Sequence, residues 1–204
     1  MIDYLTSSDF VVLMIKIIIV FGGVMGALAY LTWVERKVMA RVQMRPGPTR
    51  VGPFGLLQPI ADGLKFFFKE EVVPTNANRF LYIAAPIISL IPALLSFAVI
   101  PFGPWLQVTD LSVGLLFIFA ITSLGVYGIV LGGWASNSKY PLMGAMRSSA
   151  QMISYELSLT LSIIGVLMIA NTLSLSQLVM SQQHTWLGFI PRWNIFLQPV
   201  AFLV

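Results

Sequence analysis

Long apolar stretches alternate with short polar connections along most of this chain. A helix needs roughly 20 consecutive apolar residues to cross about 30 Å of hydrocarbon. Four stretches reach that length, and a fifth is cut off by the end of the sequence: about 10–34, 80–101, 112–134, 149–170 and 193–204. The pattern predicts an all-α polytopic membrane protein with four complete transmembrane helices and a truncated fifth. We expect these helices to form one membrane domain over residues 1–204.

Composition agrees with this pattern. Hydrophobic residues make up 57% of the chain and charged residues only 10%, whereas soluble domains have shares near ~45–50% and ~25%. The apolar part of the fifth stretch begins at Ile195, and at a helical rise of ~1.5 Å per residue it could reach only about 15 Å. We therefore expect a piece of a longer protein whose last segment ends inside the bilayer.

The first apolar stretch is expected to remain as a helix and not to be a cleaved signal, because it lacks a basic start and a small-residue cleavage pattern. Gly22 and Gly26 within it have the small-xxx-small spacing that permits close contact between membrane helices.

The connection from Glu35 to Arg79 concentrates the charge, holding 12 of the 20 charged residues. Residues 45–55 are rich in proline and glycine and predict a rigid, irregular segment. Residues 60–70 then follow helical spacing: Ile60, Leu64, Phe67 and Phe68 share one face, and Asp62, Lys65 and Lys69 lie opposite. This pattern predicts an amphipathic helix lying in the membrane interface.

Lysine and arginine also predict the orientation, since short loops rich in these residues stay on the cytoplasmic side. Ten of the twelve lie in 35–79 or 135–148, and the connections 102–111 and 171–191 have none. We expect a multi-pass protein with its N-terminus outside and the charged connection inside.

The residues that are missing exclude several kinds of chemistry within this chain. It contains no cysteine and a single histidine, His184, so it cannot hold a thiolate-ligated iron–sulfur cluster or a bis-histidine haem. We expect no metal site, no strands, no nucleotide fingerprint and no nucleic-acid partner. If the protein takes part in redox chemistry, the electron carrier must lie outside this chain.

Two groups of residues are candidates for function from their positions alone. Glu35, Arg36 and Arg45 lie at the cytoplasmic end of the first span, where arginine could supply fixed donors to a polar headgroup or only anchor the helix. Glu156 lies inside the fourth span, where an ionisable group is costly and marks a proton or ion pathway. Its polar neighbours on the helix leave open a structural hydrogen-bonding role.

Several motifs carry a resemblance to a known family: ERK at 35–37, QMRPGP at 43–48, GPFGLLQPIADGLKFFFKE at 52–70, GWASNSKY at 133–140 and ISYE at 153–156. In this order they resemble the H subunit of bacterial NADH:quinone oxidoreductase, respiratory complex I, and mitochondrial NADH dehydrogenase subunit 1. The resemblance covers the whole chain but only roughly the N-terminal 60% of the family.

The resemblance implies a protein without a redox centre that admits quinone as substrate and couples its reduction to proton translocation. Its partners would be the peripheral iron–sulfur subunits, the other membrane-arm subunits and the lipid bilayer, in the bacterial inner membrane. Asp62 and Lys65 would face the quinone chamber beside Glu35, Arg36 and Arg45, and Glu156 would lie on the proton path. The alternatives are the corresponding subunit of a related hydrogenase or other donor:quinone oxidoreductase, and a secondary ion transporter.

Overall fold

The structure is a computed structural model that describes residues 8–103, 105–183, 185–186 and 190–203. These residues form two compact units, one ending at Val72 and the other beginning at Val73. His184, which the sequence places in an external connection, lies outside the described residues.

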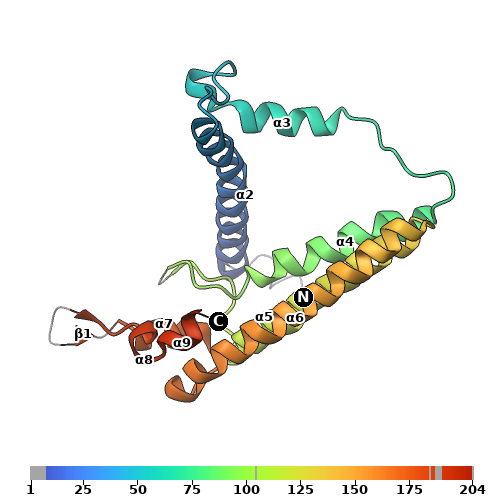
Figure 1. The fold of residues 1–204 in the computed structure, drawn as a ribbon. Helices are drawn as coiled ribbons and strands as arrows, with labels where there is room; N and C mark the ends of the chain where they lie inside the picture. The colour runs from blue at the N-terminus through green and yellow to red at the C-terminus, as the bar shows by residue number, and fades with distance from the viewer. Residues whose placement is uncertain (1–7, 104, 184, 187–189, 204) are drawn as a thin grey trace. The chain divides into compact units, whose positions relative to one another are not determined.

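The first unit is built on one long helix, α2, which runs from Ser8 to Val42 (Figure 1). Its segment Phe10–Val42 is long and apolar enough to cross a membrane. The helix continues about two turns beyond residue 34, because residues 35–42 contain neither proline nor glycine and include good helix formers. Glu35 and Arg36 are therefore helical, whereas the sequence placed them in the connection.

The proline- and glycine-rich segment after α2 is irregular, which confirms the prediction. Its regular part is a short 3-10 turn, η1, at Pro53–Gly55. Gly55 has a φ of 78° and lies against the carbonyl oxygen of Pro48, where any Cβ would collide with that oxygen. Only glycine satisfies both the left-handed conformation and this close approach.

The predicted amphipathic helix is also confirmed. It is α3, from Gln58 to Phe67, with a proline in its first turn, where the missing N–H of proline has no helical partner to lose. Ile60, Leu64 and Phe67 remain exposed on it. Phe68 and Lys69 lie just beyond its end, one turn earlier than the pattern predicted.

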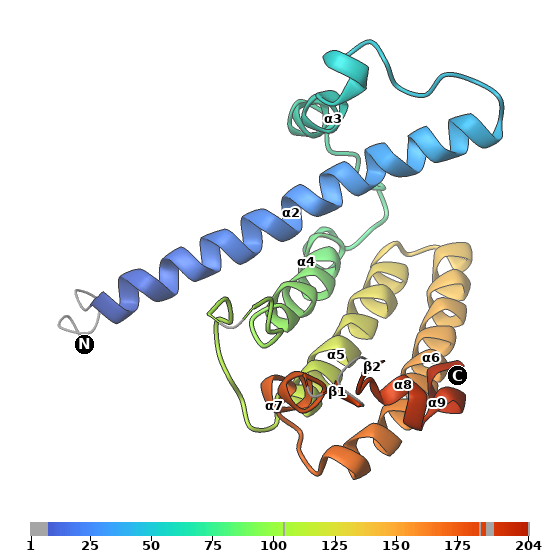
Figure 2. The same ribbon diagram turned by 90° about the vertical axis from the view of Figure 1, so that its left-hand side faces the viewer.

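The second unit contains three long helices: α4 (Arg79–Ser96), α5 (Gly114–Ala135) and α6 (Lys139–Ala170). Helix α5 lies between α4 and α6 and packs against both (Figure 2). The start of α4 is tied to the end of α5, since Asn78 N donates to Ala135 O at 2.9 Å. The pair is therefore antiparallel.

Glycines on α5 set how closely these helices approach. A Cβ at Gly128 would lie 2.6 Å from the carbonyl oxygen of Ala85 on α4. A Cβ at Gly133 would lie 2.9 Å from the carbonyl oxygen of Pro141 on α6. Ser89 adds a polar link from α4, donating from Oγ to the carbonyl oxygen of Gly125 at 3.3 Å.

Helix α6 begins well before the predicted span at 149, so Lys139 and Arg147 are helical and not part of a connection. The chain turns between α5 and α6 within 136–138, where Asn137 has a φ of 48°. Asparagine tolerates this left-handed conformation better than most residues.

After α6 the chain forms α7 (Leu175–Ser181), a short antiparallel hairpin of β1 (Thr185–Trp186) and β2 (Ile190–Pro191), and the short helices α8 (Asn194–Leu197) and α9 (Pro199–Leu203). The hairpin pairs Thr185 with Pro191 and Trp186 with Ile190, so the expectation of no strands is wrong here. The predicted fifth span is interrupted at Gln198, because the residue before a proline is pushed out of the helical region.

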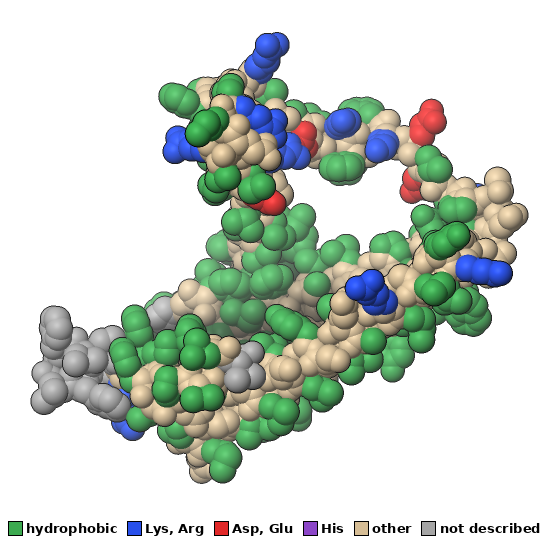
Figure 3. Space-filling model, viewed as in Figure 1, with side chains coloured by type: hydrophobic (Ala, Val, Ile, Leu, Met, Phe, Trp, Pro, Cys, Tyr) green, Lys and Arg blue, Asp and Glu red, His purple; other side chains and the backbone are tan. Residues whose placement is uncertain are grey.

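Side chains confirm the membrane character of the helices. Large apolar side chains stay exposed along them, including Ile18, Leu31 and Leu161 at 63–67%. Among the described residues, four helices are long and apolar enough to span a membrane, which makes this a multi-pass membrane protein. In Figure 3 hydrophobic side chains cover much of α4–α6, whereas charged ones gather at the end of α2 and along α3.

Candidate functional site

The end of α2 turns the chain back on itself. Arg45 N donates to Ala40 O at 2.9 Å and Met44 N donates to Arg41 O at 3.0 Å, with Met44 in the left-handed region at a φ of 53°. This is the Schellman arrangement that ends many helices, with methionine where glycine is usual. It directs Arg45 and the residues after it back along the helix.

Gly47 lets the returning segment lie directly on α2. A Cβ at this position would be 3.3 Å from the Cα of Lys37 and 3.4 Å from the Cβ of Ala40. Ala40 is buried beneath the segment, at 3% exposed. A larger side chain at either position would lift the segment from the helix.

A groove of about 410 Å³ lies between the returning segment and the last turns of α2. The helix contributes Thr32, Glu35, Arg36, Met39 and Ala40, and the segment contributes Arg45, Pro46, Gly47 and Pro48. Its wall thus combines apolar groups with two guanidinium groups and one carboxylate. Such a mixture suits a ligand with a flat apolar body and a polar edge that accepts hydrogen bonds.

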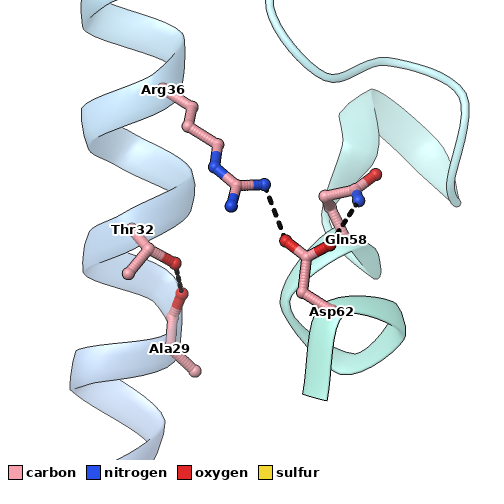
Figure 4. Close-up of polar contacts among 5 residues, drawn as sticks. All are labelled: Ala29, Thr32, Arg36, Gln58 and Asp62. Carbon is pink, nitrogen blue, oxygen red and sulfur yellow. Dashed lines mark hydrogen bonds and ion pairs between the residues drawn. The ribbon is translucent and has the colours of Figure 1, made fainter. Parts of the chain in front are cut away.

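Arg36 also joins α2 to α3. Its Nη1 donates to Oδ2 of Asp62 at 2.6 Å, and Gln58 donates from Nε2 to Oδ1 of the same carboxylate at 3.0 Å (Figure 4). The hydrogen bond from Gln58, then the hydrogen bond and charge of Arg36, hold the pKa of Asp62 below its usual value, and Lys65 adds to this through its charge. Asp62 is therefore held as the anion that binds Arg36 of α2 to α3.

Arg45 has a different partner. Its Nε donates to Oε1 of Gln43 at 2.7 Å, and this amide carries no charge. The two arginines of the groove thus differ in charge pairing. The charge of Arg36 is balanced by Asp62, whereas that of Arg45 has no ion-pair partner among the described residues.

The structure brings together most of the residues that the sequence predicted for this site. Glu35, Arg36 and Arg45 line the groove, Asp62 binds Arg36, and Lys65 acts on Asp62 from one turn along α3. Sequence reasoning missed Gln58 and Gln43. The spacing of four between Gln58 and Asp62, which places two side chains on the same helix face, was the available signal for Gln58.

Glu156 lies on α6, in the second unit, and its side chain is half-buried. Its backbone carbonyl accepts a hydrogen bond from Thr160 Oγ1 at 2.8 Å. The neighbouring hydroxyls bond in the same way to carbonyls of their own helix, with Ser154 donating to Ala150 O and Ser158 to Ser154 O. Within the part of the chain that the structure describes, no side chain bonds to the Glu156 carboxylate.

No group of three or more histidine, cysteine, aspartate or glutamate side chains comes together as a metal site among the described residues. The charged groups that line the groove are those of Arg36, Arg45 and Glu35.

Comparison with known proteins identifies the family. The family model for NADH dehydrogenase matches residues 15–204. The chain is 51% identical to an H subunit of NADH-quinone oxidoreductase from Solibacter usitatus, over 98% of this chain and 53% of that protein. It is 46% identical to an H subunit of the same enzyme from Geobacter metallireducens, over 98% of this chain and 62% of the relative.

A relative from Chondrus crispus, NADH-ubiquinone oxidoreductase chain 1, is 51% identical over 91% of this chain and 56% of its own length. The chain thus spans little more than half the length of the relatives it matches. The match covers both units, including the segment 35–70 that builds the groove and the helix that carries Glu156. This chain belongs to the NADH dehydrogenase family, which includes the H subunits of NADH-quinone oxidoreductase and chain 1 of NADH-ubiquinone oxidoreductase.

Proposed function

We propose that this chain forms part of the wall of the quinone-binding chamber in a proton-pumping NADH-quinone oxidoreductase, and that it helps to couple quinone reduction to proton translocation. The observation that carries the proposal is the groove at the end of α2, where apolar walls meet Arg36, Arg45 and Glu35. A quinone has an apolar ring and two carbonyl oxygens that accept hydrogen bonds, and arginine supplies donors that stay charged at any working pH.

The chain would supply positioning and electrostatics and leave the redox chemistry to others. It contains no cysteine and one histidine, so electrons would reach the quinone from an iron–sulfur cluster in a peripheral subunit. The names of the relatives give NADH as the electron donor, which favours this function over that of a related hydrogenase. Glu156 would connect the chamber to the proton-translocating membrane-arm subunits.

The test is Arg36→Ala in the assembled complex. We expect quinone reduction to fall roughly tenfold, the effect of losing one charge-assisted hydrogen bond. Electron transfer from NADH to a soluble acceptor such as ferricyanide should persist, since that acceptor takes electrons before the quinone step. Arg50→Ala is the matched control, because Arg50 is exposed on the same connection and lies outside the groove. Normal quinone turnover in assembled Arg36→Ala would refute the proposal.

We also propose that the chain lies in the bacterial inner membrane with its N-terminus outside, as the lysine and arginine distribution favours. Because the chain has no cysteine, single cysteines can report the orientation. Thr49→Cys and Ser138→Cys should react with an impermeant thiol reagent only from the cytoplasmic side, and Gln183→Cys only from outside. All three positions are exposed. Reaction of Gln183→Cys from the same side as the other two would overturn this orientation.

A further inference from the structure

The Asp62 carboxylate is held at both of its oxygens, each by a different element. Oδ2 accepts from Arg36 on α2 at 2.6 Å, and Oδ1 accepts from Gln58 on α3 at 3.0 Å (Figure 4). A carboxylate with a single partner loses one hydrogen bond when it rotates about its last bond, whereas one with a partner at each oxygen loses two and is held more firmly. The direction from which Asp62 meets Arg36 therefore depends on Gln58.

Gln58 suits this task because of where it lies. It is one turn before Asp62 on the same helix, so that the two side chains are neighbours, and it is half-buried. It is also at the start of α3, directly after the turn in which Gly55 closes against Pro48. Gln58 thus fixes the position of the carboxylate relative to the base of α3.

Arg36 is the side chain that a correctly oriented Asp62 would hold in place. Its side chain is 54% exposed, and long exposed side chains sample many rotamers when nothing holds them. One amino group of the guanidinium is used by Asp62, which leaves its other donors for a ligand in the groove. If Asp62 turned away, Arg36 would have to order itself each time a ligand bound.

We propose that Gln58 is a positioning residue of the quinone site, acting through Asp62 to hold the guanidinium of Arg36 at the groove. The inference rests on the proposed function. Arg36 from α2 and Lys65 from α3 are the charged groups that act on Asp62, and both favour its anionic form. Gln58 adds a neutral hydrogen-bond donor, which orients the Asp62 carboxylate and brings no charge of its own.

The first experiment measures Gln58→Leu in the assembled complex with a short-chain quinone as substrate. We expect KM to rise about three- to tenfold and kcat to stay within about twofold. Part of the free energy of quinone binding would then be used to order the Arg36 side chain. Gln58→Glu should be at least as harmful, since a second carboxylate would repel Asp62 and compete for Arg36. If Gln58→Leu assembles poorly, Gln58→Ala, which removes the amide donor without adding a charge, decides the question.

The second experiment places Gln58→Leu in an Asp62→Leu background. A residue that acts only through Asp62 should add nothing to KM once Asp62 is gone, whereas a residue that merely stabilises α3 should add its full effect. An additive double variant, or parental KM in both Gln58→Leu and Gln58→Glu, would overturn the inference.

These outcomes are separable from failure of the proposed function. If Arg36→Ala reduces quinone normally, the groove is not the quinone site and both proposals fall. If Arg36→Ala is impaired while the Gln58 variants have parental KM, only the positioning role is wrong.

Discussion

Glu156→Gln is expected to lower proton translocation by about a hundredfold in an assembled complex, the lower end of the contribution of a positioned proton-transfer group. Glutamine keeps the shape and most of the hydrogen-bonding capacity of glutamate but cannot bind and release a proton. The Glu156 side chain is half-buried on α6, a helix long and apolar enough to span a membrane, where a carboxyl group is costly to retain without a function.

Glu156→Asp tests the carboxyl group separately from the shape of the side chain. It keeps a carboxyl group that can bind and release a proton, on a shorter side chain, and should keep part of the pumping. The measurement is acidification of the vesicle lumen during NADH oxidation, with assembly checked on native gels. Glu71→Gln is a suitable control, since Glu71 is exposed on the segment after α3. Parental pumping in both Glu156 variants would make this residue a structural group and remove it from the proton path.

Gly128→Ala should reduce the amount of assembled protein severely, because the new methyl group would lie 2.6 Å from the carbonyl oxygen of Ala85 and would also meet the Ser89 side chain. Backbone atoms cannot move aside as a flexible side chain can. We expect a destabilisation of about 3 kcal/mol, the upper part of the range for overpacking.

Gly125→Ala provides the matched comparison on the same helix. Nothing lies within 4 Å of a Cβ at Gly125 among the described residues, so alanine should be neutral or gain up to ~1 kcal/mol from its higher helix propensity. Membrane content of the two variants, measured after identical expression, checks this. Equal levels would mean that α4 and α5 do not pack as closely as the structure has them.

The candidate site was only partly predictable from the sequence. Glu35 and Arg36 stood out as charges at the end of an apolar run, and Asp62 and Lys65 as the polar face of a short helix. The family resemblance placed these residues around one chamber. The pairing of Arg36 with Asp62 was not predictable, because the two are 26 residues apart and the intervening proline- and glycine-rich segment has no periodicity. Met44 in the left-handed region and the contact of Gly55 with Pro48 decide where that segment turns.

Helix packing in the second unit was also not predictable from the sequence alone. The close approaches of α5 are at Gly128 towards α4 and at Gly133 towards α6, whereas a Cβ at Gly125 on the same helix would meet nothing within 4 Å among the described residues. Small-residue spacing states which helices can approach closely, and the partner that faces them decides whether they do.

The sequence by itself determined that this is a multi-pass helical membrane protein with one charged, amphipathic connection, because bilayer thickness requires long apolar runs and those runs are local features of the chain. The tertiary structure alone decided that α2 carries Glu35 and Arg36 on its own last turns, that Gln58 and Asp62 hold Arg36, and that Arg45 returns to the same groove. Those relations depend on where irregular backbone turns, and a turn made of single left-handed residues and close contacts leaves no periodic pattern in the sequence.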